Sequence, residues 1–477
     1  MSRMRWALAV GWAWAWAWTW AWVSGVEGRP LEARRDGFGV GFDVGRGLPG
    51  WPAASAAPET GYLSPKGGAH DDHLFYWYYA AQEGAKDGNG TADGETPVVL
   101  WLTGGPGCSS AIAMFYENGP VAFGADGQMA ANPHGWNARA HLVFVDQPVG
   151  TGFSYTHDAR DVVTNEDEVG RVMYGFLEAF FDAHPELREA PLYVTGESYA
   201  GHYVPAITYK IWRETKGQGP PGKRSMNLQG MAIGNGLTDP GVQYAAYADF
   251  AEAEGLISHD VAAAMRAAYP ACKALIDACA VSDKACVAAV VECQATAFAP
   301  ILAGNPGINV YDVRENPCPG SHPLCYDFTA MEGYMARPDV RQSLGVPDDV
   351  QFESCSAGVH AALTTDWMKN LEVHIPELLD SGDVRVLIYA GDKDLICNWL
   401  GNERWTRAMR WGGRAGFNAA PVAKWTLENP HDGTSVDAGE FRAFGALTFL
   451  KVYNAGHMVP MDQPGVALAM LDDFIRV

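Results

Sequence analysis

The chain is short of basic residues. Its 477 residues include 34 Lys and Arg against 56 Asp and Glu, which gives a formal net charge of −22 at pH 7. A nucleic-acid-binding protein needs a basic footprint for the phosphate backbone, so this balance argues against a nucleic-acid partner. An acidic balance suits a soluble protein instead, including one in an acidic compartment.

Long hydrophobic runs are also absent, except at the N-terminus. There Arg3 and Arg5 precede an apolar stretch at residues 6–23, and small residues follow it. We expect a secretory signal peptide over residues 1–25, with an uncleaved anchor as the alternative, and no stable membrane association after cleavage. Residues 26–58, rich in Gly, Pro, Ala and Arg, are expected to be a propeptide or a loose N-terminal arm. The destination would be an acidic vacuole-like or lysosome-like compartment, or the outside of the cell.

The C-x-x-C spacing of structural zinc sites is missing, although the chain has nine cysteines. In a secretory chain this number indicates disulfides, and an odd count leaves one cysteine unpaired unless it bonds another chain. Four of them, Cys272, Cys279, Cys286 and Cys293, are spaced seven apart. Seven residues are about two helical turns, so paired helices could carry nested bridges. Spacing alone leaves the connectivity, and a zinc cluster, open.

Apolar strand-like runs recur through the rest of the chain, with helix-like stretches between several of them. The runs are residues 74–79, 98–102, 142–145, 192–195, 230–233, 384–389 and 447–452. They predict a mostly parallel sheet with helices on both faces and an active site at the carboxyl ends of the strands. Residues 240–337 instead have Ala-rich and Cys-rich helical sequence, which we interpret as a cap inserted into a catalytic domain of residues 59–477. The sequon at Asn89 predicts a glycan in a polar loop.

The run at residues 192–195 leads into G-E-S-Y-A, with Ser198 at its centre. Small residues two before and two after a serine let a strand and a helix pass closely around a strained turn, the nucleophile elbow. Ala200 departs from the strict G-x-S-x-G pattern, and an ordinary strand-to-helix turn can look the same. Ser198 is therefore a candidate nucleophile that needs partners elsewhere in the chain.

A serine hydroxyl needs a histidine to take its proton and a carboxylate to hold that histidine. Asp394 follows the run at 384–389 and His457 follows the run at 447–452, which gives the chain order Ser, Asp, His expected for this layout. Each alone would more often be a turn or loop residue, but together they predict a catalytic triad. The glycine-rich residues 103–110 follow another strand and can supply the N–H groups of an oxyanion hole. A phosphate cradle is the alternative, but G-K-[ST] is absent and Pro106 lacks an amide donor.

Several longer stretches carry a family likeness. They read W-L-T-G-G-P-G-C-S-S at 101–110, D-Q-P-V-G-T-G-F-S-Y at 146–155, T-G-E-S-Y-A-G-H-Y-V-P at 195–205, I-G-N-G-L-T-D-P at 233–240, A-G-D-K-D-L-I-C-N-W-L-G-N at 390–402 and N-A-G-H-M-V-P at 454–460. From about residue 61 to the C-terminus the chain resembles the serine carboxypeptidases, most closely the carboxypeptidase Y branch. The resemblance implies an α/β-hydrolase fold with a helical, disulfide-stapled cap. It implies a serine-type carboxypeptidase that removes C-terminal, hydrophobic residues from peptides and proteins at acidic pH, with no metal or cofactor.

Carried over by position, the resemblance implies an acyl-enzyme on Ser198, with Asp394 and His457 as its partners. The oxyanion hole would be made by the backbone amides of Gly105 and Tyr199. The residues implied to bind substrate are Thr103, Gly104, Glu117, Glu197, Tyr311, Tyr326 and Met458.

Two of these substrate-binding residues are acids with a shared task. Glu117 and Glu197 would share a proton with the substrate's terminal carboxylate, and deprotonation at higher pH would turn that contact repulsive. Tyr311, Tyr326 and Met458 would line a hydrophobic pocket for the C-terminal side chain; aromatic residues near a cap are otherwise mostly core packing.

One position departs from the family pattern, because Thr103 stands where the family carries Asn in W-L-N-G-G. A single hydroxyl replaces an amide that helps to bind the terminal carboxylate. Losing one charge-assisted hydrogen bond costs roughly 1.5–3 kcal/mol, which is about one or two orders of magnitude in binding. The substitution therefore puts in question how strictly the enzyme would require a free C-terminal carboxylate. An esterase or acyltransferase on the same scaffold is the alternative function.

For the cysteines the resemblance implies the bridges Cys108–Cys355 and Cys318–Cys325 and a cluster paired within itself, taken as Cys272–Cys293 and Cys279–Cys286. Cys397 would be left as a free thiol near the site, either sensitive to mercurials or inert and buried.

Two further alternatives for the function stay open. A metallocarboxypeptidase is one, since His374 and Glu377 fit an H-x-x-E zinc pattern, although Pro376 disturbs the geometry and further ligands are not apparent. A catalytically silent binding protein is the other.

Overall fold

The computed structural model describes residues 47–67, 70–82, 96–124, 126–215, 226–318, 324–428 and 435–476. The predicted signal peptide, most of the predicted arm and the sequon at Asn89 lie outside these residues. The last part of the predicted arm is packed rather than loose. Trp51 stacks on Trp77 and Tyr79, with ring centroids 6.4 and 6.2 Å apart. The folded domain therefore includes residues before 59, because stacking on these rings buries apolar surface.

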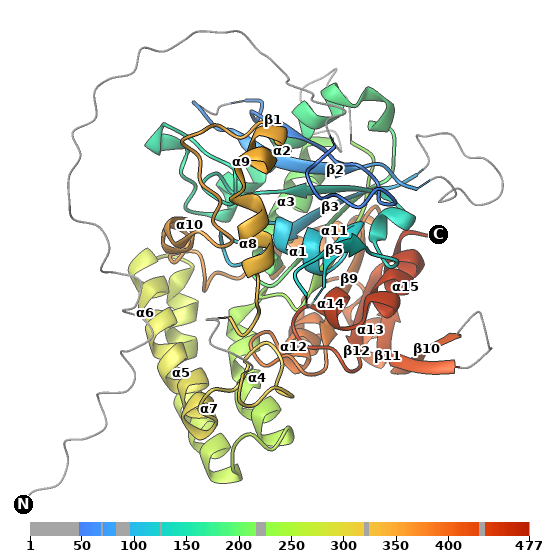
Figure 1. The fold of residues 1–477 in the computed structure, drawn as a ribbon. Helices are drawn as coiled ribbons and strands as arrows, with labels where there is room; N and C mark the ends of the chain where they lie inside the picture. Colours follow the sequence, from blue (N-terminus) through green and yellow to red (C-terminus); the bar gives the residue numbers. More distant parts are fainter. Residues whose placement is uncertain are drawn as a thin grey trace, which may run out of the picture.

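A ten-stranded mixed sheet forms the centre of the molecule (Figure 1), in the order β1-β2-β6-β3-β7-β8-β9-β12-β11-β10. The strands are β1 (Glu59–Leu63), β2 (Leu74–Tyr79), β3 (Val98–Thr103), β6 (His141–Val145), β7 (Leu192–Glu197), β8 (Leu228–Gly234), β9 (Arg385–Gly391), β10 (Ala423–Glu428), β11 (Ser435–Phe444) and β12 (Leu447–Val452). Strands β6 to β12 in this order are parallel, and the edges on both sides are antiparallel. A separate ribbon pairs β4 (Val121–Phe123) with β5 (Met129–Ala131). The predicted mostly parallel sheet is confirmed.

Helices cover both faces of this sheet, and further helices form the cap. They are α1 (Ala111–Tyr116), α2 (Glu166–Ala183), α3 (Ala200–Thr215), α4 (Pro240–Ala253), α5 (His259–Cys279), α6 (Asp283–Cys293), α7 (Ala299–Gly304), α8 (Thr329–Met335), α9 (Pro338–Ser343), α10 (Ala357–Ala362), α11 (Ile375–Ser381), α12 (Trp399–Ala408), α13 (Arg414–Ala419), α14 (Val459–Asp462) and α15 (Pro464–Ile475). Side chains alternate along a strand, so Leu100 and Leu102 of β3 share a core with α2 and α3. Val99 and Trp101 share the opposite core with α1 and α15. Burial on both sides explains why these strands read as continuous apolar runs.

The helical region that follows β8 begins where the sequence predicted the cap. The Asp239 side chain accepts a hydrogen bond from the N–H of Val242, and Pro240 occupies the first helical position of α4. An aspartate cap followed by proline is a strong helix start, because the acid satisfies a free N–H and proline needs none.

Helices α5 and α6 form a hairpin that projects from the body of the molecule (Figure 1). The bridges Cys272–Cys293 and Cys279–Cys286 join its two helices. This is the nested pairing, and it excludes the zinc cluster. By length and composition alone, the stretch Asp283–Gly304 could cross a membrane, and it is the one such helix in the part of the chain that the structure describes. Because that stretch is bonded to α5 through both of its cysteines, the match is weak evidence for a span.

Candidate active site

Five neighbouring parallel strands end at one edge of the sheet, and four of them lead to the predicted site residues. In spatial order they are β3, β7, β8, β9 and β12. The glycine-rich loop follows β3, Ser198 follows β7, Asp394 comes three residues after β9, and His457 comes five residues after β12. Because carboxyl ends of parallel strands meet at the same edge, the sheet gathers residues that are far apart in the sequence.

Ser198 occupies a strained turn between β7 and α3. Its φ is 67°, in the left-handed region that residues other than glycine rarely adopt. The turn is held by the Ser198 N–H, which donates to the carbonyl of Gly234 at 3.1 Å. A Cβ added to Gly196 would lie 2.7 Å from the Cβ of Ala200, so strand and helix leave no room for a side chain at position 196. The predicted nucleophile elbow is present, with Ala200 in place of a second glycine.

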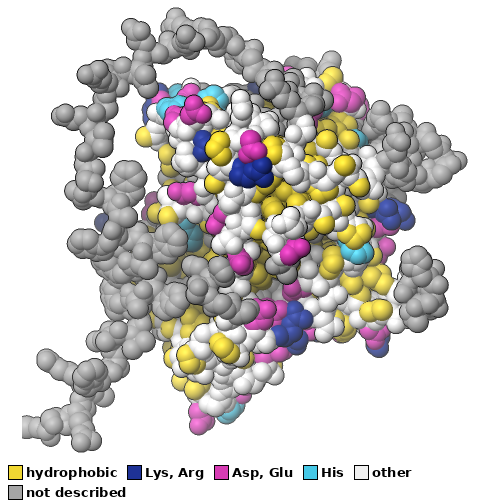
Figure 2. Space-filling view, in the orientation of Figure 1, with side chains coloured by type: hydrophobic (Ala, Val, Ile, Leu, Met, Phe, Trp, Pro, Cys, Tyr) yellow, Lys and Arg dark blue, Asp and Glu magenta, His cyan; other side chains and the backbone are white. Residues whose placement is uncertain are grey.

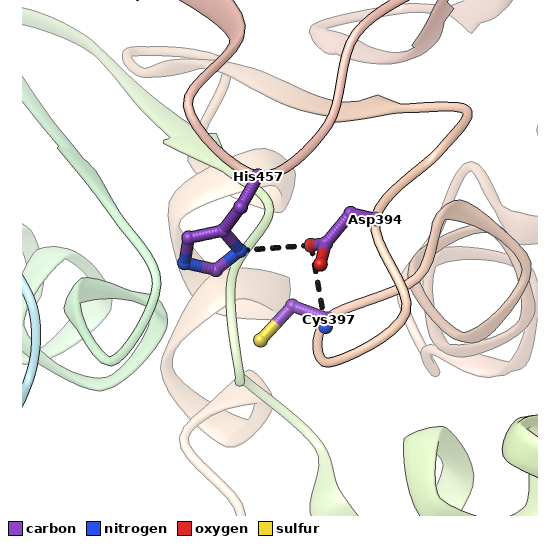
Figure 3. Close-up of side chains that lie close together, drawn as sticks. All are labelled: Asp394, Cys397 and His457. Carbon is purple, nitrogen blue, oxygen red and sulfur yellow. Dashed lines mark hydrogen bonds and ion pairs between the residues drawn. The ribbon is translucent and has the colours of Figure 1, made fainter. Parts of the chain in front are cut away.

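His457 and Asp394 face each other across the end of the sheet (Figure 3), with Nδ1 of the imidazole 2.8 Å from Oδ2 of the carboxylate. Asp394 is 0 % exposed, and a buried carboxylate needs hydrogen-bond donors. It receives them from Nδ2 of Asn235 at 2.8 Å and from the N–H groups of Cys397 and Ile396 at 3.2 and 3.0 Å. The carboxylate favours the tautomer with its proton on Nδ1, which leaves Nε2 as the acceptor.

The glycine-rich loop after β3 presses against the elbow. A Cβ added to Gly104 would lie 2.3 Å from the backbone nitrogen of Tyr199 and 2.9 Å from the Cβ of Ser198. Only glycine permits this approach. Gly105 follows with a φ of 110°, a conformation that also requires glycine. The structure thus brings the loop of Gly104 and Gly105 beside the amide of Tyr199 and the serine.

Asp146 is hydrogen-bonded to the other end of this loop. It lies in one of the family-like stretches, but the sequence alone did not indicate a role for it. Its carboxylate accepts from Oγ of Ser109 at 2.6 Å and from the N–H groups of Ser110 and Phe153 at 3.2 and 2.9 Å. Burial raises the pKa of Asp146 to about 6, against the opposing effect of these donors. The Cys108–Cys355 bridge ties the same loop to the chain that follows the cap.

Glu117 and Glu197 lie together below the surface, 3 % and 2 % exposed. Burial raises the pKa of Glu117 to about 8. Burial, and then the charge of Glu117, raise the pKa of Glu197 well above its ordinary value. The two carboxyl groups therefore keep a proton between them at acidic pH.

Thr103 is the cross-strand neighbour of Glu197 in the pairing of β3 with β7. Its hydroxyl oxygen accepts a hydrogen bond from Nε1 of Trp101 at 3.2 Å. With that lone pair used, the hydroxyl hydrogen remains to donate to a ligand beside the acid pair.

The aromatic residues predicted to line a substrate pocket lie beside the imidazole. The ring of Tyr311 lies 5.6 Å from that of Tyr326 and 5.1 Å from that of His457, between centroids. The carbonyl of Tyr311 accepts from the N–H of His457 at 2.8 Å. Met458 follows directly and is buried. Burial raises the pKa of both tyrosines, so their phenols stay neutral.

Cys397 is the free cysteine of the part of the chain that is described, and it is buried. In Figure 3 its thiol lies beside the pair of Asp394 and His457. Burial, and then the charges of Asp394 and Glu197, raise the pKa of the Cys397 thiol. Since the thiolate is the reactive form, this environment favours an inert thiol.

The H-x-x-E stretch lies away from this site. His374 stacks on Tyr209 with ring centroids 4.7 Å apart, and Glu377 accepts from the hydroxyl of Tyr209 at 2.6 Å. Among the described residues, the one group of His, Cys, Asp or Glu close enough to hold a metal ion is Asp394, Cys397 and His457. The zinc-pattern alternative therefore has no ligand set in the described chain.

The remaining predicted bridge, Cys318–Cys325, is also present, so all four predicted pairings occur.

Against known proteins, the sequence profile of the family described as "Serine carboxypeptidase" matches residues 49–477. The chain belongs to the serine carboxypeptidase family. This carboxypeptidase is thus a hydrolase of the exopeptidase class, which acts on peptides.

Individual relatives agree with this assignment. Serine carboxypeptidase-like 47 of Arabidopsis thaliana is 45% identical over 404 residues, or 84% of this carboxypeptidase and 75% of the relative. Serine carboxypeptidase 3 of Hordeum vulgare is 44% identical over 433 residues, which cover 90% of this chain and 80% of the relative. Carboxypeptidase Y homolog A of Leptosphaeria maculans is 39% identical over 425 residues, which cover 87% of this chain and 73% of the relative.

The fold of this carboxypeptidase also matches a solved structure. The crystal structure of Kex1, described as a prohormone-processing carboxypeptidase from Saccharomyces cerevisiae, superposes with a TM-score of 0.78 at 28% identity. The match covers 90% of this chain and 93% of that one. The predicted α/β-hydrolase fold and the likeness to the carboxypeptidase Y branch are confirmed.

Proposed function

We propose that this carboxypeptidase cleaves its substrates through an acyl-enzyme on Ser198. Nε2 of His457 takes the hydroxyl proton as Oγ attacks the carbonyl carbon of the last peptide bond. The imidazolium, stabilised by Asp394, then gives that proton to the leaving amine, and the C-terminal residue departs as a free amino acid. A water molecule that loses its proton to His457 next hydrolyses the ester and releases the shortened peptide.

The observation that carries this proposal is the hydrogen bond of 2.8 Å between His457 and Asp394 at the sheet edge where the elbow also ends. The oxyanion of each tetrahedral intermediate accepts from the backbone amides of Gly105 and Tyr199. Support comes from Gly104, whose missing side chain lets the loop reach the amide of Tyr199. Donors held in place before the reaction stabilise developing charge without reorganisation.

Recognition of the terminal carboxylate falls to Glu117, Glu197, Thr103 and the backbone at Gly104. The protonated acid pair donates a hydrogen bond to the carboxylate, and the hydroxyl of Thr103 adds another. Support comes from the burial of both acids and from their raised pKa values. Loss of the shared proton would leave like charges facing each other, so peptide cleavage is favoured at acidic pH.

The residue that is removed is hydrophobic. Tyr311, Tyr326 and Met458 line its pocket beside the imidazole, and both tyrosines are half-buried with neutral phenols. An apolar side chain gains by leaving water there, by roughly 1.5–3 kcal/mol for a residue such as Leu or Phe.

The four disulfides indicate that the chain folds in an oxidising compartment of the secretory pathway. Its proposed destination is an acidic vacuole-like or lysosome-like compartment, or the outside of the cell, where peptide and protein C-termini are the substrates. On the face drawn in Figure 2, acidic and basic side chains are interspersed among the coloured residues without a broad basic patch, in keeping with the net charge of −22.

The test compares, at acidic pH, the cleavage of an N-blocked dipeptide that has a free hydrophobic C-terminal residue with cleavage of its C-terminal amide. We expect a strong preference for the free acid and no turnover by Ser198→Ala, which also should not be labelled by an organophosphonate. Equal or faster cleavage of the amide would contradict the proposed carboxylate recognition. It would favour an esterase or acyltransferase, the alternative that Thr103 raises.

A further inference from the structure

We propose that Asn235 is a positioning residue of the catalytic centre, which holds the Asp394 carboxylate in register with His457. The inference rests on the triad proposed above. Asn235 follows β8, the strand that lies between the strands leading to Ser198 and Asp394. It is 0 % exposed, and it is the residue at the end of this strand that reaches the triad.

The contact goes to the oxygen on which the triad depends. Oδ2 of Asp394 accepts from Nδ1 of His457 and from Nδ2 of Asn235, both at 2.8 Å. The other donor to Oδ2 is the N–H of Cys397 at 3.2 Å, and the N–H of Ile396 bonds the other oxygen. Asn235 is thus the only side chain besides His457 that fixes where this oxygen lies, among the contacts of the described residues.

Asparagine suits this position because both ends of its amide are used. While Nδ2 donates to Asp394, Oδ1 accepts from the N–H of Gly391, the last residue of β9, at 3.1 Å. The backbone N–H of Asn235 donates to the carbonyl of Tyr389 at 2.8 Å. Its φ of 42° lies in the left-handed region, which asparagine tolerates better than most residues. One side chain therefore joins the end of β8 to the end of β9 and to the carboxylate beyond it.

The test uses two substitutions at this position. Asn235→Ala removes the donor, and we expect kcat to fall by about tenfold to a hundredfold with little change in KM, since hydrogen bonds to charged groups are worth about that factor. Asn235→Asp keeps the shape and the acceptor for Gly391. Its introduced carboxyl can donate to Asp394 only while it is protonated.

The pH profile separates positioning from a merely structural role. With Asn235→Asp, we expect kcat near that of the wild type at the acidic end of the profile and a steep loss as the pH rises, because two carboxylates would then face each other. The other titratable groups near Asp394 are His457, the Cys397 thiol, Glu197 and the phenols of Tyr247, Tyr311 and Tyr326, and none of them is altered. Asn370→Asp is the matched control. Asn370 also donates to a carboxylate, that of Glu372, and accepts a backbone N–H, but it is exposed.

Circular dichroism at each pH checks that the variants remain folded. The proposal is overturned if folded Asn235→Asp keeps the wild-type pH profile, or if folded Asn235→Ala keeps the wild-type kcat. Should Asn235→Ala fail to fold, the pH profile of Asn235→Asp decides alone. If an organophosphonate fails to label Ser198 in the wild type, the proposed function itself is wrong; normal labelling with unchanged Asn235 variants refutes only the positioning role.

Discussion

Thr103→Asn should increase the preference of this carboxypeptidase for substrates with a free terminal carboxylate. Thr103 pairs across the sheet with Glu197, and its hydroxyl oxygen is already bonded to the indole of Trp101. One hydrogen is left to donate. An asparagine of similar size can accept the indole N–H with its amide oxygen and present an NH₂ group to the carboxylate.

The size of the gain follows from the burial of the site. Thr103 is 8 % exposed, so a donor placed there acts on the carboxylate with little competition from water. A hydrogen bond to a charged group contributes about 1.5–3 kcal/mol, or a factor of about 10 to 150. Because the hydroxyl already supplies part of this, we expect the ratio of kcat/KM for acid over amide to rise by about tenfold, mostly through KM.

The assay measures kcat/KM for a matched pair of N-blocked dipeptides, one with a free acid and one with a C-terminal amide, at a fixed acidic pH. Thr103→Val should move the acid-to-amide ratio in the opposite direction, because it removes the hydroxyl donor at position 103. Thr406→Val is the control, since the hydroxyl of Thr406 is buried and bonds only the carbonyl of Glu403 within α12. Equal ratios in the wild type, Thr103→Asn and Thr103→Val would refute the reasoning, because the hydroxyl would then not touch the carboxylate.

Further predictions concern the acid pair and the free thiol. As the pH rises toward 8, the acid pair loses its proton, so KM should rise for the free-acid substrate and stay level for the amide; steady-state kinetics across pH would contradict this if both rose together. The folded pKa of Glu117 lies above the value of 4.5 for the unfolded chain, so the stability from its protonation is full below pH 4.5 and is lost as the pH rises toward 8. Melting temperatures should therefore fall over that range, and Glu117→Gln should flatten the trend. Iodoacetamide should leave Cys397 unmodified in the native protein and alkylate it after unfolding, as mass spectrometry would show; rapid native alkylation would mean that the thiol is accessible.

The sequence predicted the central strands well because both of their faces are buried. The seven apolar runs coincide with β2, β3, β6, β7, β8, β9 and β12, and only Val384 lies outside, one residue before β9. Strand β10, at one edge of the sheet, and its neighbour β11 were not predicted. β11 carries exposed residues at both ends and polar residues at Asp437, Glu440 and Arg442, so it shows neither a continuous apolar run nor a clear alternation. Its pairing with β12 is a local hairpin that turns at Gly445 and Ala446, with Phe444 opposite Leu447, so the sequence signal lies in the turn and not in the strand pattern.

The residues of the candidate site likewise fall into those that the sequence revealed and those that only the structure revealed. Ser198, Asp394 and His457 could be found because each follows a strong strand signal and has a reactive side chain. Asn235 and Asp146 also follow strands, but an amide or an isolated acid after a strand has no distinctive pattern. Their roles depend on hydrogen bonds to partners that are distant in the sequence, Asp394 and Ser109. Only the folded sheet brings those partners within reach.

The triad and the acid pair are coupled through charge. The charge of Asp394 is one of the causes that raise the pKa of Glu197, after burial and the contacts with Glu117. While Glu117 and Glu197 share one proton, that pair carries one negative charge beside the Asp394 carboxylate, which is held by four donors. Removing the pair's proton adds a second negative charge where the substrate's carboxylate must bind. The proposed preference for acidic pH would then be a property of carboxylate recognition more than of acyl transfer, since a substrate without a terminal charge avoids the repulsion and still meets the same serine and histidine.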